Sequence, residues 1–132
     1  MPGAKQPLIC ILDDDPSFLR MCHAILEPEG YDCVVPPDLK NPVAFVRKNP
    51  VDLVLMDLRL GHVTGLEVLH GLSLERATAE IPVVICTASR DLLQEHEELI
   101  ERLGCAVVEK PFDVDDLLKA IKDCLARERA QA

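Results

Sequence analysis

The hydrophobic residues of this chain gather in five short runs. These runs occupy positions 8–12, 31–35, 51–56, 82–86 and 105–109. Most of them are continuously apolar rather than alternating, which is typical of strands buried on both faces of a parallel sheet. Pro50 and Pro82 stand at the entry to two runs, where a missing N–H does not interrupt a strand. The pattern therefore predicts five strands.

Residues that start and end helices lie between these runs. Asp15 before Pro16 predicts an N-cap followed by proline at the first helical position, and Gly30 ends that segment. The same start signal, Asn and Pro at 41–42, precedes a helical pattern over 43–48. A third helix is predicted over 66–72, directly after Gly65. The chain thus places a helix after each of its first three strands.

Two further helices are predicted in the second half of the chain. The fourth helix is strongly acidic, opens at Asp91 and ends at Gly104. Its expected inner face consists of Leu92, Leu99, Ile100 and Leu103. Asp113 caps the fifth helix, whose apolar residues recur at helical spacing. These residues are Val114, Leu117, Leu118, Ile121 and Leu125.

Strand and helix therefore alternate five times, which predicts an α/β fold. Right-handed crossovers give a parallel sheet with helices on both faces. The 132 residues suit one domain, 1–132, with a core over about 8–126. Loose segments are expected at 1–6, at 36–40 and after Ala126.

Composition narrows the partners of this domain. Acidic residues outnumber basic ones by 23 to 14, and the net charge is −9. This sign argues against direct nucleic-acid binding by this segment and against an anionic membrane surface. No apolar run approaches a membrane span or a signal peptide, so a cytoplasmic location is expected. The six cysteines form no C-x-x-C pair and lie in apolar patterns, which favours a role as core residues.

Complementary polar residues follow four of the five predicted strands. Asp13 and Asp14 follow the first strand, Asp57 the third, Thr87 the fourth and Lys110 the fifth. The carboxyl ends of parallel strands meet at one edge of the sheet, where ligands of such folds bind. Carboxylates that lie close together repel one another, and a hard cation such as Mg²⁺ relieves that repulsion. Asp15, the third acid of the run, is better explained as a helix cap.

The same group of residues suits phosphoryl transfer. Asp57 can act as a nucleophile, because carboxylates form acyl phosphates in covalent catalysis. A cation and Lys110 would stabilise charge on the phosphoryl oxygens, and Thr87 offers a hydroxyl donor. Each residue alone has an ordinary explanation as a cap, a loop hydroxyl or a solvated charge. The hypothesis rests on their joint pattern.

Four segments of the chain resemble the signature segments of response-regulator receiver domains, including those of the chemotaxis regulators. They lie at 9–16 (ICILDDDP), 51–60 (VDLVLMDLRL), 81–88 (IPVVICTA) and 109–112 (EKPF). The resemblance implies a flavodoxin-like three-layer sandwich with strand order 2-1-3-4-5. It also implies that a histidine kinase or a phosphotransfer protein phosphorylates Asp57, and that the domain then signals to a downstream partner or output domain.

The resemblance also implies residue roles. Mg²⁺ would be bound by Asp13, Asp14, Asp57 and the backbone carbonyl of Arg59. Thr87 would be the switch hydroxyl, Lys110 would contact the phosphoryl group, and the Lys110–Pro111 peptide bond would be cis. Catalysis would be limited to the domain's own phosphorylation and dephosphorylation.

The chain departs from the family pattern at several positions. Val107 stands where a tyrosine or phenylalanine is usual, so signal output is not expected to rely on aromatic burial. Gly61 replaces a usual proline in the loop after the phosphoacceptor. Arg59 and Ser89 stand at positions similar to those that tune acyl-phosphate lifetime, although Arg59 can equally be a solvent-facing arginine.

Two other functions and the role of one acidic surface also have to be weighed from the sequence. An aspartate-nucleophile phosphatase of similar topology would carry its nucleophile on the first strand, whereas the candidate here follows the third. A flavin-binding module would need a Ser/Thr-rich phosphate loop after the first strand, which the chain lacks. The acidic helix, with Glu95, Glu97, Glu98 and Glu101, is either a solvated face or a docking patch for a basic partner.

Overall fold

The computed structural model describes the backbone of residues 6–131 and the side chains of residues 6–127. A five-stranded parallel sheet with the order β2-β1-β3-β6-β7 forms its centre. The strands are β1 (Leu8–Leu12), β2 (Asp32–Val34), β3 (Leu53–Met56), β6 (Val83–Thr87) and β7 (Ala106–Glu109). Numbered along the chain, these five strands have the order 2-1-3-4-5, which confirms the expected topology.

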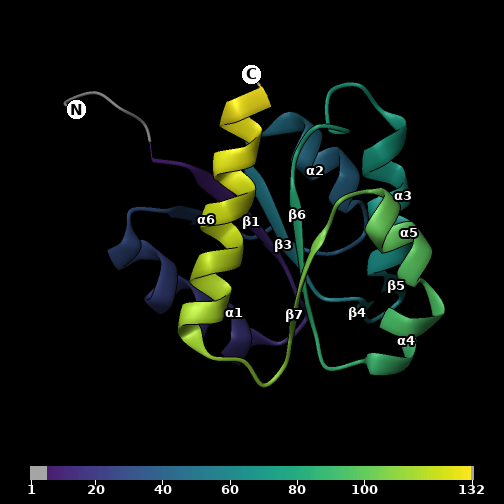
Figure 1. Cartoon of the computed structure of the whole chain (residues 1–132), viewed down its shortest axis with the longest axis horizontal. Helices are drawn as coiled ribbons and strands as arrows, with labels where there is room; N and C mark the ends of the chain where they lie inside the picture. The colour runs from purple at the N-terminus through teal and green to yellow at the C-terminus, as the bar shows by residue number, and fades with distance from the viewer. Residues whose placement is uncertain (1–5, 132) are drawn as a thin grey trace.

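Helices cover both faces of this sheet (Figure 1). One face carries α1 (Pro16–Leu26) and α6 (Val114–Gln131). The other face carries α2 (Pro42–Lys48), α3 (Gly65–Leu74), α4 (Arg90–Glu95) and α5 (Glu97–Arg102). A short 3-10 helix, η1 (Glu27–Glu29), follows α1 and ends at Gly30, which has a left-handed φ of 91°. Among the described residues, no helix has the length and apolar character that a bilayer crossing requires.

The alternation of side chains along β1 explains why its sequence is continuously apolar. Cys10 and Leu12 pack on the side of α2 and α3, and Ile9 and Ile11 pack on the side of α1 and α6. All four are fully buried, because both faces of the sheet are covered. The cysteines at 10, 22, 86 and 124 are buried and free, as expected of core residues.

The predicted acidic helix differs from the observed structure. It consists of two short helices, α4 and α5, which meet at His96 with non-helical dihedral angles (φ −118°, ψ 23°). The N-cap of α4 is Ser89 rather than Asp91, and the Ser89 Oγ accepts a hydrogen bond from the Leu92 N–H. The break resets the helical phase, so Ile100 is buried but Leu103 is 37% exposed. The prediction of Leu103 on the inner face was wrong.

The apolar seam of α6 is also displaced from the predicted one. Leu117, Ile121 and Cys124 are buried at i, i+4 and i+7, whereas Val114 is 45% exposed in the first turn. The helix continues to Gln131, so the segment after Ala126 is not loose as expected.

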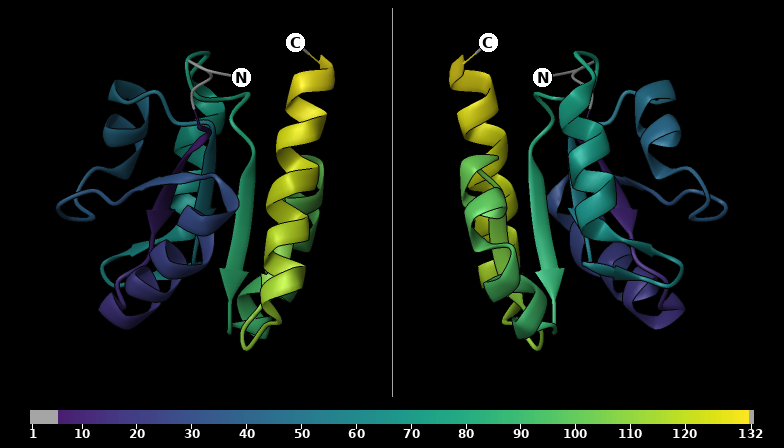
Figure 2. Two further views of the ribbon diagram at one scale, coloured as in Figure 1. Left: turned by 90° about the vertical axis from the view of Figure 1, so that its left-hand side faces the viewer. Right: turned by 90° about the vertical axis from the view of Figure 1, so that its right-hand side faces the viewer.

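The carboxyl ends of the strands share one end of the molecule. Figure 2 shows the arrowheads of β1 and β6 pointing to the end at which α1 and α6 begin. The loop after β3 folds there into an unpredicted antiparallel hairpin of β4 (Arg59–Leu60) and β5 (Val63–Thr64), which turns at Gly61 with φ 80°. Gly61 adopts this left-handed conformation without steric cost. The candidate site lies at this end.

Candidate functional site

Backbone hydrogen bonds between neighbouring strands align the candidate residues at one edge of the sheet. The Asp57 N–H donates to the Leu12 carbonyl at 3.0 Å, and the Lys110 N–H donates to the Thr87 carbonyl at 2.9 Å. These bonds continue the parallel pairing of β1 with β3 and of β6 with β7 by one residue. The polar residues predicted after four strands therefore lie at the same edge, as expected.

The centre of the site is an ammonium group between two carboxylates. Lys110 Nζ donates to Asp13 Oδ2 at 2.9 Å and to Asp57 Oδ2 at 3.0 Å. The side chain of Asp13 is 2% exposed and that of Asp57 is 13% exposed. Such shielded ion pairs are screened by solvent much less than surface pairs. Residues from three strand ends thus form one charge cluster.

Burial and the ion pair have opposite effects on the titration of this cluster. Burial raises the pKa of the Asp13 carboxyl above its ordinary value, although the hydrogen bond and the charge of Lys110 act to lower it. Burial alone would lower the pKa of Lys110, but its hydrogen bonds and charge interactions with Asp13 and Asp57 outweigh that effect and raise its pKa. Lys110 therefore remains a cation at neutral pH.

Aromatic rings position the lysine. Lys110 Nζ lies 3.9 Å from the centroid of the Phe18 ring, within the range of a cation–π interaction. Phe18 in turn meets Phe112 edge-to-face, with ring centroids 6.3 Å apart. The Lys110–Pro111 bond is cis, as the family resemblance implied. The sequence analysis missed Phe18, because its position in α1 resembles any core position of a helix.

Thr87 connects this cluster to the start of α4. Its side chain is buried, and its hydroxyl oxygen accepts a hydrogen bond from the Ser89 N–H at 3.2 Å. This bond uses a lone pair and leaves the O–H group as a donor. Because Ser89 caps α4, a change in the Thr87 hydroxyl can reach this helix through a single hydrogen bond.

The two other predicted metal ligands, Asp14 and Arg59, lie at the rim. Asp14 is exposed, and a Cβ on Gly61 would lie 3.9 Å from its Oδ2. The backbone N–H of Arg59 donates to Asp57 Oδ1 at 3.2 Å, while the side chain of Arg59 is exposed. This position suits both roles expected for Arg59, a solvent-facing arginine and a residue that tunes acyl-phosphate lifetime.

Close packing behind Asp57 fixes its main chain. The Gly65 N–H donates to the Leu58 carbonyl at 2.8 Å. A Cβ on Gly65 would lie only 2.4 Å from the backbone oxygen of Asp57. No residue other than glycine fits at this position without a backbone shift.

The donor set of the site suits a hard cation. Asp13 and Asp57 share the Lys110 ammonium through their Oδ2 atoms, while their Oδ1 atoms accept the backbone N–H groups of Asp15 and Arg59. Carboxylate oxygens are the donor type that Mg²⁺ prefers. Within the part of the chain that the structure describes, no three acidic, histidine or cysteine side chains converge as a ready-made metal cage. The four-ligand set remains a prediction.

A cleft of about 440 Å³ opens beside Asp57. Arg59, Thr87 and Ser89 line it, together with Arg90 and Asp91 from the start of α4. Two arginines therefore stand at the mouth of an acidic site, where an incoming anion would meet them first. Arg90 was not singled out from the sequence, because only the three-dimensional course of α4 brings it to this cleft.

Comparison with known proteins finds a sequence family that covers most of this chain. The family model described as "Response regulator receiver domain" matches residues 9–122. The heme response regulator HssR of Staphylococcus saprophyticus is 31% identical over 117 residues, which are 89% of this chain and 50% of HssR. The transcriptional regulator RpaA of Synechocystis is 34% identical over 122 residues, which are 92% of this chain and 50% of RpaA. The chain thus spans about half the length of these two relatives.

A relative of similar length and two solved structures extend the comparison. The polar-differentiation response regulator DivK of Brucella ovis is 30% identical, with 89% of this chain and 94% of DivK covered. A CheY-like receiver domain protein of Methanospirillum hungatei has a TM-score of 0.84 at 26% identity, with coverage of 97% and 100%. The receiver domain of sensor histidine kinase PA1611 of Pseudomonas aeruginosa, solved with magnesium in its active-site cleft, has a TM-score of 0.78 at 23% identity, with coverage of 93% and 99%.

Proposed function

Because this chain belongs to the response regulator receiver domain family, we propose that it accepts a phosphoryl group on Asp57 and relays the resulting change to a partner. One observation carries the assignment of residues. Lys110 bridges Asp13 and Asp57 at the carboxyl edge of the sheet, where such folds bind ligands. The family is a signalling family, so turnover of an external substrate is not part of the proposal.

The proposed donor is a phosphohistidine on a histidine kinase or a phosphotransfer protein. A carboxylate oxygen of Asp57 forms the new bond to phosphorus, while the bond from phosphorus to the imidazole nitrogen breaks. The leaving imidazole takes up a proton from solvent. Hydrolysis of the acyl phosphate later returns inorganic phosphate and the free carboxylate.

Charge stabilisation is the main task of the surrounding residues. The Lys110 ammonium, held by the two carboxylates and Phe18, is placed to contact the phosphoryl oxygens. Asp13, Asp14, Asp57 and the backbone carbonyl of Arg59 would hold Mg²⁺, which supplies further positive charge beside those oxygens. The magnesium described for the PA1611 receiver domain supports this assignment.

Thr87 is the proposed reporter of phosphorylation. Its O–H can donate to a phosphoryl oxygen, and its oxygen already accepts from the N-cap of α4. Phosphorylation would favour the conformation in which Thr87 and Lys110 close onto the new group. Through Ser89, that change reaches the face formed by α4, α5 and β7.

The proposal also covers the extent of the domain, its location and its partners. We propose that residues 1–132 form one receiver domain that works in the cytoplasm and signals to a downstream protein or an output domain. The high acidic charge argues against direct DNA binding by this segment, even though its relative RpaA is a DNA-binding regulator. The comparisons give no support to an aspartate-nucleophile phosphatase.

Small-donor labelling tests the proposal. The protein is incubated with acetyl phosphate and Mg²⁺, and intact mass is recorded for the parent, Asp57→Asn and the matched control Asp38→Asn. We expect one added phosphoryl group in the parent and in Asp38→Asn, loss of labelling in Asp57→Asn, and loss in all samples with excess EDTA. Equal labelling of Asp57→Asn and the parent would refute the assignment of Asp57.

A further inference from the structure

The ammonium group of Lys110 has a third partner that takes no part in the proposed chemistry. Its Nζ lies 2.9 Å from Asp13 Oδ2, 3.0 Å from Asp57 Oδ2 and 3.9 Å from the centroid of the Phe18 ring. Asp57 is the proposed phosphoacceptor, and both aspartates are proposed metal ligands. The phenylalanine ring is neither, so of these three contacts it is the one that phosphorylation does not consume.

Phosphorylation would weaken both carboxylate contacts. When Asp57 becomes an acyl phosphate, the negative charge that faced Lys110 moves from the carboxylate to the phosphoryl oxygens. A divalent cation bound by Asp13 competes with Lys110 for the same carboxylate, because its negative charge attracts both. The ammonium therefore loses two partners at the stage when it has to contact the phosphoryl oxygens.

A lysine side chain does not keep one position by itself. Its four-carbon stem is flexible, and holding it in one conformation costs rotamer entropy. Electrostatic catalysis depends on charges that are already in place when the phosphoryl group is transferred. An aromatic ring with a negative face can hold a cation without neutralising it, which leaves the ammonium able to stabilise the phosphoryl oxygens.

The Phe18 ring is itself fixed in place. Phe18 is the third residue of α1 and is 7% exposed. The start of this helix is tied to the site, because its N-cap residue Asp15 donates its N–H to Asp13 Oδ1 at 2.9 Å. Phe112, in the loop after β7, meets the Phe18 ring edge-to-face with an interplanar angle of 82°. The ring therefore forms a rigid surface beside the lysine.

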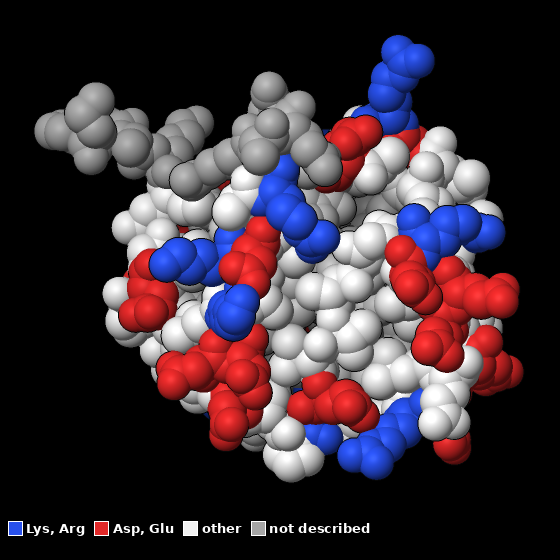
Figure 3. Space-filling model, viewed as in Figure 1, with Lys and Arg blue, Asp and Glu red and all other residues white. Residues whose placement is uncertain are grey.

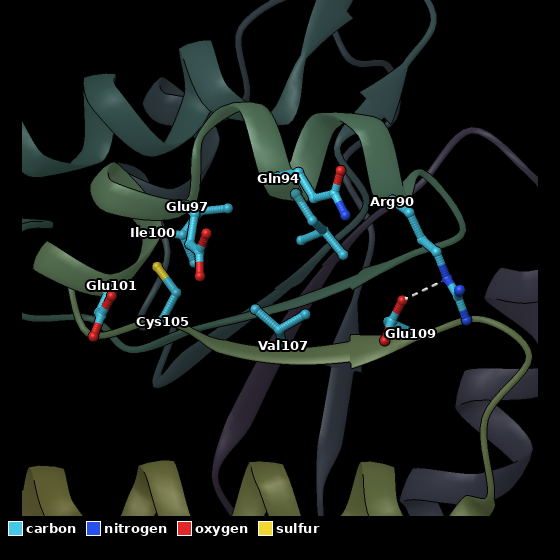
Figure 4. A pocket seen from close by; sticks show the side chains of 9 residues that line it. Arg90, Gln94, Glu97, Ile100, Glu101, Cys105, Val107 and Glu109 are labelled. Atoms are coloured by element: carbon cyan, nitrogen blue, oxygen red, sulfur yellow. Dashed lines mark ion pairs between the residues drawn. The ribbon is translucent and has the colours of Figure 1, made fainter.

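Shielding from solvent distinguishes this contact from the ion pairs on the surface. Figure 3 shows charged side chains spread over one face of the molecule, where water screens them. The Arg90–Glu109 pair is of this kind, with Nε and Oε1 3.1 Å apart and side chains that are 82% and 51% exposed (Figure 4). The side chain of Lys110 is only 21% exposed. A cation–π contact is stronger when it is desolvated, so the Phe18 ring has more effect on Lys110 than it would have at the surface.

We propose that Phe18 is a positioning residue of the phosphorylation site, whose ring holds the Lys110 ammonium beside the phosphoryl oxygens while both carboxylates are engaged with the phosphoryl group and the metal. The inference rests on the proposed function and adds a residue of α1 to it. Phe18 acts through Lys110 and needs no contact of its own with the phosphoryl group. A weaker hold on the ammonium raises the barrier to transfer, so phosphorylation slows while the fold is kept.

Ring fluorination separates this role from simple packing. Fluorine withdraws charge from the face of a phenylalanine ring and changes its size little, so it weakens a cation–π contact and largely preserves the packing. Phe18 is replaced site-specifically by phenylalanines with one, two and three ring fluorines, and intact mass gives the rate of labelling by acetyl phosphate with Mg²⁺. We expect the rate to fall with each added fluorine, by about two- to tenfold for the most fluorinated ring.

Phe45 provides the matched control, because it packs on the other face of the sheet. The same fluorinated residues at position 45 should leave the labelling rate unchanged. A rate that does not depend on fluorination at position 18, or that falls equally for positions 18 and 45, overturns the inference.

Proton shifts of Lys110 test whether the contact persists after phosphorylation. Protons over the face of an aromatic ring resonate upfield, and the CH₂ group next to Nζ should show this shift in the parent. We expect the upfield shift to remain in the complex with Mg²⁺ and beryllofluoride, a stable phosphoryl mimic, and to be absent from Phe18→Leu with and without the mimic. A return of these protons to the ordinary lysine position in the beryllofluoride complex of the parent overturns the inference.

The labelling data separate failure of this inference from failure of the proposed function. If Asp57 of the parent is labelled but the rate does not change with fluorination at position 18, the inference fails and the proposed function stands. If the parent is not labelled in the presence of Mg²⁺, the proposed function fails, and the inference fails with it.

Discussion

Replacement of Gly65 by alanine is a sharp test of how the site is built. The new Cβ would lie 2.4 Å from the Asp57 backbone oxygen and 2.9 Å from Leu58 Cα. Favourable carbon contacts need about 3.5–4.0 Å, so the Leu58 contact alone is roughly 0.6 Å too short. Both partners are main-chain atoms, and no side-chain rotation can relieve the overlap. The backbone that carries Asp57 has to move.

The expected cost follows from two opposing effects. Overpacking of this kind costs about 1–3 kcal/mol, while alanine recovers about 0.4–1 kcal/mol by restricting the unfolded chain. We therefore expect Gly65→Ala to lower the free energy of unfolding by roughly 1–2 kcal/mol. A backbone shift at Asp57 should also slow phosphorylation by acetyl phosphate on the order of ten- to a hundredfold.

Gly71→Ala is the matched control, because it is also a glycine of α3. Its Cβ would lie 2.8 Å from Val43 Cγ2, a side-chain methyl group of α2 rather than a main-chain atom beside Asp57. We expect a stability change of less than about 1 kcal/mol and an unchanged labelling rate. Urea unfolding and the rate of mass increase with acetyl phosphate measure both quantities. A Gly65→Ala protein as stable and as rapidly labelled as the parent would refute the argument.

Three further predictions concern the core and the lysine. Phe18→Leu should lose about 2 kcal/mol of stability in urea unfolding, because it removes a cation–π contact and an aromatic pair; a loss no larger than that of Phe45→Leu contradicts this. Lys110→Met should raise the pKa of the Asp13 carboxyl further, since Lys110 lowers it. An NMR titration of the Asp13 carboxyl without Mg²⁺ measures this change, and an unchanged titration midpoint would contradict the prediction. Burial raises the pKa of the Cys10, Cys22 and Cys86 thiols from 9.0 to about 12. As the pH rises, these thiols lose their protons in the unfolded chain before they do so in the folded protein. The free energy of unfolding should therefore fall by roughly 1.4 kcal/mol per thiol between pH 8 and pH 10. Thiolate absorbance that rises before unfolding would contradict this last prediction for Cys10, Cys22 and Cys86.

The sequence predicted the sheet well, because burial on both faces leaves a strong signal. Continuous apolar runs located all five strands to within two residues at either end. The polar residues that follow the runs were correctly expected to meet at one edge, since parallel strands place their carboxyl ends together. The family resemblance supplied the strand order and the cis bond before Pro111.

Tertiary contacts decided what the sequence could not predict. The acidic stretch contains no proline or glycine that would indicate the break at His96, so one helix was expected where two exist. The hairpin formed by β4 and β5 is only two residues long on each side, too short for a periodic pattern. Phe18 and Arg90 occupy ordinary helix positions, and only the packing of α1 and α4 brings them to the site.

The charge arrangement determines how the proposed site would meet a phosphoryl donor. A chain with a net charge of −9 repels a phosphorylated partner at a distance, and Asp13 and Asp57 repel it at contact. Lys110 supplies one positive charge against these two carboxylates, so the inner cluster remains anionic by one charge when both are ionised. A divalent cation would reverse that sign, whereas Arg59 and Arg90 at the mouth of the cleft offset it only in part. Under the proposed function, this charge balance favours phosphorylation of Asp57 only with a bound cation. Arg59 and Arg90 line the same cleft, where they would meet the charge that phosphorylation brings.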